Sequence, residues 1–151
     1  MNTESSTEAQ PLTGSVAFLN RTYDDAMALL VEARNYVAYR QAVEEKGLPP
    51  RVRVRISYET MRMTTRLTQV MAWLLAQRAV QEGEIDQSKA VGADYALGGH
   101  EICLADGAND DESLPEGLRA LLRRSLSLYE RIDRLEQQIR ENMANDNTPP
   151  Q

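Results

Sequence analysis

The stretch 56–82, ISYETMRMTTRLTQVMAWLLAQRAVQE, is the strongest indication of how this chain folds. It contains no glycine or proline, and its apolar side chains recur at intervals of three and four residues, which predicts one long amphipathic helix. No side chain on the predicted stripe is suited to covalent or acid–base chemistry, so this helix is expected to pack against other helices. The stripe consists of Ile56, Thr60, Met63, Leu67, Val70, Met71, Leu74 and Leu75.

The composition of the chain indicates a single folded domain and argues against several classes of protein. A chain of 151 residues with 42% hydrophobic residues is typical of one folded domain. The formal net charge of −6 argues against a general attraction to nucleic acid or to an anionic membrane. One cysteine excludes an internal disulfide, the polar N-terminus does not resemble a signal peptide, and no apolar run approaches the roughly 20 residues of a membrane span. We therefore expect a cytoplasmic protein.

Breaker residues divide the chain into three predicted long helices. Ser15 is a suitable N-cap for the first helix, Gly47 is its expected stop, and Pro49 and Pro50 prevent its continuation. The proline and acids near residue 115 suit the start of the last helix. The predicted helices cover about 15–46, 54–82 and 115–143, inside a domain over 14–143 that is flanked by disordered tails at 1–13 and 144–151.

The connection over 84–113 differs in composition from the helices. It is rich in glycine and in acidic residues, which predicts an irregular segment. Within it, 86–91 is a candidate short helix, and the apolar pieces 93–97 and 100–104 are expected to tuck against the helices. A connection of this length is usually functional or partly mobile.

The predicted architecture is all-α, an antiparallel three-helix bundle that runs up, down and up. Apolar residues of the third helix follow a 3-4 spacing over about three heptads. Together with Tyr58, Met61 and Trp73 on other faces of the second helix, this is more apolar surface than a three-helix monomer needs, so we expect a symmetric homodimer. The residues assigned to the core or dimer seam are Met63, Leu67, Val70, Met71, Leu74, Leu128, Ile132, Leu135 and Ile139.

Candidate catalytic and metal residues are few. His100, Glu101 and Cys103 form the one cluster of metal-ligand types, but structural zinc needs four ligands and the chain has a single His and a single Cys. The simpler interpretation makes Cys103 a small buried apolar residue. No nucleophile motif or phosphate-binding loop is evident. We expect no cofactor, no metal and no enzymatic activity.

Arginines of the second helix allow several interpretations. Arg55, Arg62 and Arg66 could be a solvated face with local ion pairs such as Arg55–Glu59. They could also be a basic patch that docks an acidic protein, which is the role we assign to them. A nucleic-acid-associated helical protein that uses this arginine face is the alternative, although no helix-turn-helix spacing or aromatic interleaving accompanies it.

Three segments resemble a known family. RTYDDAMALLVEARNYV (21–37), RLTQVMAWLLAQRAVQEGEI (66–85) and LYERIDRLEQQI (128–139) are similar to helices of the bacterial regulator-of-CtrA-degradation family. The resemblance covers roughly residues 18–140, and the order and spacing of the segments agree.

This resemblance implies a homodimer of three-helix subunits without enzymatic activity. It implies an adaptor that binds cargo proteins, helps deliver them to the ClpXP protease under cell-cycle control, and works with a response-regulator-like priming partner. A disordered C-terminal tail belongs to the working surface of the family, and in this chain the corresponding tail is the short segment 144–151.

Overall fold

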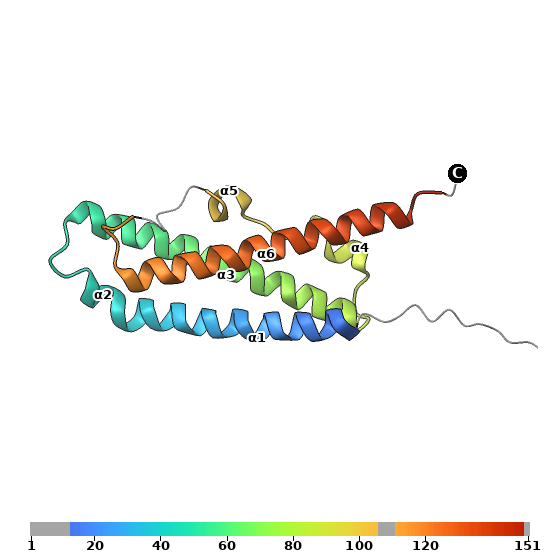
Figure 1. The fold of residues 1–151 in the computed structure, drawn as a ribbon, viewed down its shortest axis with the longest axis horizontal. Coiled ribbons are helices and arrows are strands. Elements are labelled where there is room, and N and C mark those ends of the chain that lie inside the picture. The colour runs from blue at the N-terminus through green and yellow to red at the C-terminus, as the bar shows by residue number, and fades with distance from the viewer. Residues whose placement is uncertain (1–12, 106–110, 150–151) are drawn as a thin grey trace, which may run out of the picture.

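The computed structural model describes residues 13–105 and 111–149, and the regular structure of these residues is entirely helical (Figure 1). The predicted all-α class is confirmed. Most of the predicted N-terminal tail lies outside the described residues, whereas 144–146 of the predicted C-terminal tail belong to the last helix. The long helices are α1 (Thr13–Asn35), α3 (Pro50–Gln81) and α6 (Glu116–Asp146), and short helices are α2 (Gln41–Glu44), α4 (Gln87–Ala90) and α5 (His100–Cys103).

The first predicted helix contains a π-helical turn. Helix α1 continues through η1 (Tyr36–Arg40) into α2, so the chain stays helical to Glu44. A π-helical turn holds more residues than an α-helical turn and shifts the side chains that follow it around the axis. Tyr36 is buried and its hydroxyl donates a hydrogen bond of 2.6 Å to Glu44 Oε2, whereas Tyr39 beyond it is largely exposed.

Proline and glycine set the ends of the helices. Gly47 has a φ of +77°, which only glycine adopts easily, so its predicted role as the stop of the first helix is confirmed. Helix α3 begins at Pro50, four residues before the predicted start. Proline needs no N–H partner at a first helical position, and the Pro49 carbonyl accepts hydrogen bonds from the amides of Val52 and Arg53.

The last helix does not run in the predicted direction. Arg66 of α3 bonds to Ser125 of α6, and Trp73, one to two turns later, bonds to Glu136, so residue numbers rise together along the two helices. Helices α3 and α6 are therefore parallel, and α1 alone runs against them (Figure 1). The expectation of an up-down-up antiparallel bundle is wrong, because the connection after α3 is long enough to return along a helix of about 48 Å at 1.5 Å per residue.

The return connection packs on the long helices. Helices α4 and α5 both contact α3, and Ala90, Leu97 and Cys103 are buried. The predicted anchoring of this segment by its short apolar pieces is confirmed. Gly83, with a φ of +75°, ends α3 and turns the chain back.

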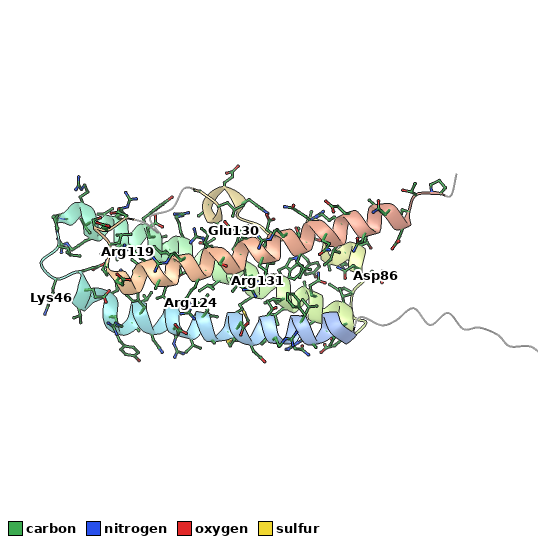
Figure 2. The ribbon with its side chains drawn as sticks, in the orientation of Figure 1. Lys46, Asp86, Arg119, Arg124, Glu130 and Arg131 are labelled. Atoms are coloured by element: carbon green, nitrogen blue, oxygen red, sulfur yellow. The ribbon has the colours of Figure 1, made fainter. Side chains whose placement is uncertain are left out.

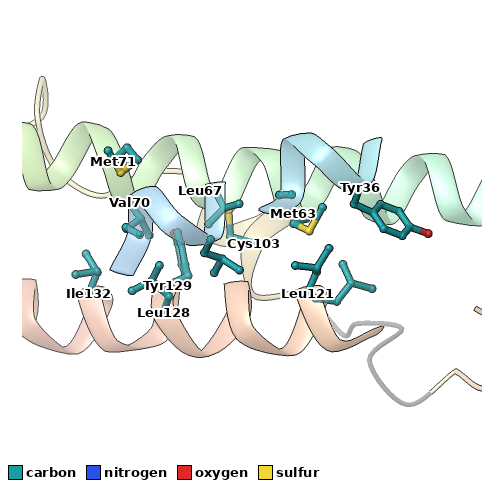
Figure 3. Packing of buried hydrophobic residues seen from close by; sticks show 14 of the residues in the cluster. Tyr36, Met63, Leu67, Val70, Met71, Cys103, Leu121, Leu128, Tyr129 and Ile132 are labelled. Carbon is teal, nitrogen blue, oxygen red and sulfur yellow. The ribbon is translucent and has the colours of Figure 1, made fainter. Parts of the chain in front are cut away.

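The core is one apolar cluster shared by the three long helices (Figure 3). Residues predicted for the core or dimer seam lie inside this single chain: Met63, Leu67, Val70, Met71, Leu74, Leu128 and Ile132 are buried, and Leu135 and Ile139 pack partly buried against them. Trp73, predicted on another face, is also buried at 1% exposure. No helix within the described ranges is long and apolar enough to cross a membrane.

Truncating a core leucine should cost far more than truncating an exposed apolar residue. Leu67 is fully buried, so Leu67→Ala should lower the free energy of unfolding by about 2–5 kcal/mol through lost burial and a cavity. Val31 is 39% exposed on α1, and Val31→Ala should change it by about 0.5 kcal/mol. Urea unfolding followed by circular dichroism measures both. Equal effects of the two substitutions would contradict this core.

Candidate functional site

The predicted docking patch at Arg55, Arg62 and Arg66 is wrong for two of its three members. Arg62 is 2% exposed and Arg66 is fully buried. Both guanidinium groups donate to carbonyls of residues 97–105, a part of the return connection that we call the strap. Helical periodicity places these two side chains on one side of α3 but does not show that another segment covers that side.

Arg62 joins its own helix to the strap. Its Nη1 donates to both carboxylate oxygens of Glu59, at 3.1 and 2.8 Å, and Glu59 is itself only 3% exposed. Nε donates to the carbonyl of Ile102 at 3.0 Å and Nη2 to that of Ala105 at 2.6 Å. Every nitrogen of this buried guanidinium therefore has an acceptor, and its charge is balanced by a buried carboxylate.

Arg66 joins α3, the strap and α6. Its Nε donates to the carbonyl of Cys103 at 2.8 Å, and its Nη1 lies 3.3 Å from the carbonyl of Leu122 and 3.4 Å from the hydroxyl of Ser125. Burial, and then the nearby charge of Arg62, lowers the pKa of Arg66. This arginine is part of the interior and is not available to a partner.

Arg55 is the exposed member of the predicted patch, but it already has a partner. Its side chain is 50% exposed, and its Nε lies 2.9 Å from Asp111 Oδ2. The predicted pairing of Arg55 with Glu59 is wrong, because Glu59 pairs with Arg62. With two of the three cations buried, the alternative of a nucleic-acid site on this arginine face loses its basis.

A buried carboxylate that the sequence reading missed fastens the strap to α6. Glu136 is 5% exposed, and its Oε2 accepts hydrogen bonds from Trp73 Nε1 at 2.7 Å and from the backbone amide of Leu97 at 2.8 Å. The sequence does contain a signal for this burial, because Glu136 follows Ile132 by four residues and therefore lies on the apolar stripe of its helix. An acid there indicates a buried group that needs donors.

Further hydrogen bonds hold the start of the strap. Tyr129 donates from its hydroxyl to the carbonyl of Gly98 at 2.7 Å, and the Gly98 amide donates to the side-chain oxygen of Gln69 at 3.1 Å. His100 Nε2 lies 2.7 Å from Asp133 Oδ1. Side chains from α3 and α6 thus fix the strap along its length, so the strap is an integral layer of the fold.

The candidate metal cluster does not assemble. Cys103 is fully buried among core side chains (Figure 3), and this burial raises the pKa of its thiol. His100 faces Asp133, while Glu101 is exposed. Across the described residues, no group of three or more His, Cys, Asp or Glu is placed to hold a metal ion.

The exposed side of α3, opposite the stripe that faces the core, is a candidate interaction surface, which we call the outer face. Between residues 54 and 75, all of which the structure describes, Arg55 at its edge is the only exposed charge. Val54 and Met61 are each 70% exposed. A charge-depleted strip with exposed apolar side chains is typical of the centre of a protein–protein interface. The outer face consists of Val54, Ser57, Tyr58, Met61, Thr64, Thr65, Thr68, Ala72 and Leu75.

Threonine hydroxyls on the outer face are bonded within the helix. Thr64 donates to the carbonyl of Thr60 at 2.9 Å, Thr65 to that of Met61 at 3.0 Å, and Thr68 to that of Thr64 at 2.8 Å. These hydroxyls need no new partner when the face is covered, so removing the face from water carries a small polar cost.

Removing the buried guanidinium should loosen the strap. In Arg62→Ala, Glu59 becomes an unpaired buried charge and two strap carbonyls lose their donor, so the free energy of unfolding should fall by about 3–5 kcal/mol. Arg55→Ala breaks an exposed pair and should cost about 0–1 kcal/mol. Urea unfolding measures both, and amide hydrogen exchange should accelerate at 97–105 only in Arg62→Ala. Similar stabilities for the two variants would show that the buried pair does not hold the strap.

Comparison with known proteins agrees with this fold. A family model described as "Protein of unknown function (DUF1465)" matches residues 12–151. The crystal structure of RcdA from Caulobacter crescentus CB15 is similar, with a TM-score of 0.65 and 34% sequence identity, covering 81% of this chain and 91% of that one. No curated protein matches the chain.

The match with RcdA has the identity and coverage expected within one family, and the family model spans nearly the whole chain. The resemblance seen in the sequence of the three long helices is thereby confirmed. The chain belongs to the DUF1465 family and is an RcdA-like protein.

Proposed function

We propose that this protein is a non-enzymatic regulatory adaptor that binds cargo proteins and helps deliver them to the ClpXP protease, in a cell-cycle setting and with a response-regulator-like priming partner. The observation that carries the proposal is the similarity to RcdA, at 34% identity over most of both chains. The regulatory role follows from the family resemblance, and the surface chemistry of the chain supports it.

The hydrogen-bond partners of the buried polar side chains favour a protein-binding role over a catalytic one. Three of the buried polar groups, Glu59, Arg62 and Glu136, bond to backbone or to neighbouring side chains of the fold. They hold the strap in place and do not converge on an open cleft, which a catalytic constellation requires. The outer face of α3 is instead an exposed, nearly uncharged surface that a partner can cover.

We also propose that two copies associate through the outer face. A symmetric dimer places the same patch of both subunits together, so an uncharged patch avoids like-charge repulsion although each chain carries −6. Positions 54, 58, 61, 65, 68, 72 and 75 alternate steps of four and three residues, the spacing with which helices pack side by side. The strip is about 32 Å long at 1.5 Å per residue.

A charge placed on the outer face should break the proposed dimer. Light scattering should give the mass of two chains at micromolar concentration for the parent protein and of one chain for Met61→Glu. A carboxylate buried there without a partner should raise the dissociation constant about 100-fold or more. Val31→Glu adds the same charge to an exposed apolar site on α1 and should leave the dimer intact. A monomeric parent, or a dimeric Met61→Glu, would refute this assignment.

The adaptor role can be tested by capture and reconstitution. Affinity purification from cells that carry proteolytically inactive ClpP should enrich the protease and its cargo together with this chain. The captured cargo, mixed with purified ClpXP and the priming partner, should then be degraded faster when the chain is added, because an adaptor raises the effective concentration of cargo at the protease. ATP omission is the control. An unchanged degradation rate after addition of the chain would refute delivery.

A further inference from the structure

A groove between α1 and α6 carries a second kind of surface. It consists of two hollows, of about 380 and 370 Å³, which share Arg124. The first is lined by Asp25, Arg123, Arg124 and Arg131 above Leu29 and Leu128, and the second by Glu32, Arg40 and Arg124. Figure 2 shows Arg124 and Arg131 between the ribbons of these two helices.

Charge in the groove is opposite to the charge of the chain. Four arginines and two acids line the two hollows, in a protein whose formal net charge is −6. Arg124 and Arg131 are exposed, whereas Leu29 and Leu128 beneath them are buried and form an apolar floor. A cationic rim over an apolar floor attracts an anionic chain that also carries apolar side chains.

One guanidinium of the groove, that of Arg124, is already paired with Glu32. Its carboxylate accepts two hydrogen bonds from Arg124, at 2.5 and 3.0 Å, and both side chains are 51% exposed. The hydrogen bond from Arg124 lowers the pKa of Glu32. Exposed pairs of this kind contribute little to stability, so an incoming carboxylate can replace Glu32 on the guanidinium. The pair therefore shows the geometry in which the groove holds a carboxylate.

We propose that this groove binds an extended acidic segment of a partner protein, with carboxylates on Arg124 and Arg131 and an apolar side chain over Leu29 and Leu128. The lining favours such a peptide over nucleic acid, because no aromatic side chain lines the first hollow and Tyr36, which lines the second, is 3% exposed and cannot stack a base. The inference rests on the groove alone and does not depend on the adaptor role.

Binding of a defined peptide to the full chain tests the proposal. The probe is a fluorescein-labelled peptide of twelve residues, rich in Glu with two Leu, and its control replaces every Glu by Gln. Anisotropy should show binding of the Glu peptide that weakens with added salt, and no binding of the Gln peptide. Arg131→Glu should weaken binding about tenfold or more through repulsion. Glu32→Gln should strengthen it severalfold by freeing Arg124.

Matched controls keep the result interpretable. Arg53→Glu makes the same charge reversal at an exposed site on α3 that does not line the groove, and should change affinity far less than Arg131→Glu. Circular dichroism should show the parent helicity in each variant. Absence of binding, equal binding of the Glu and Gln peptides, or equal losses in Arg53→Glu and Arg131→Glu would overturn the proposal. Tighter binding of a labelled single-stranded DNA that Arg131→Glu abolishes would also overturn it.

Discussion

The buried guanidinium of Arg62 is the contact on which the rest of the arrangement depends. A lone charge in the interior would cost far more than its hydrogen bonds return, but Glu59 balances it from the preceding turn of the same helix. Its remaining donors are thus directed to the carbonyls of Ile102 and Ala105. With the strap held against α3, the chain returns to the end where α3 began, and α6 starts there and runs parallel to it.

This use of charge in the interior determines the character of the surface. Because Glu59, Arg62 and Arg66 are buried, the exposed side of α3 between residues 54 and 75 is left almost without charge. Three arginines of α6 line the groove with α1, namely Arg123, Arg124 and Arg131, and Arg124 pairs there with Glu32. One small chain therefore presents a nearly uncharged strip on α3 and a cationic groove between α1 and α6, and these two surfaces share no residue.

Much of the fold was predictable because its signals are local. Periodic apolar residues such as Leu67 and Ile132 place one face of each long helix in the core, and Gly47 ends the first helix because it adopts a positive φ. The candidate site was predicted poorly. Arg62 and Arg66 look like exposed cations on a helical wheel, and their acceptors lie about 40 residues further along the chain, where no local pattern indicates contact.

The helical class, the long helices, the apolar core stripes and the family were all predictable from the amino-acid sequence. Hydrophobic periodicity, helix-breaking residues and sequence similarity along a helix are signals that extend over only a few turns. The three-dimensional fold was needed to show that α6 runs parallel to α3, that Arg66 and Glu136 are interior groups, and that Met61 lies on the outer face. Burial of a polar side chain depends on which distant segment covers it and supplies its hydrogen-bond partners.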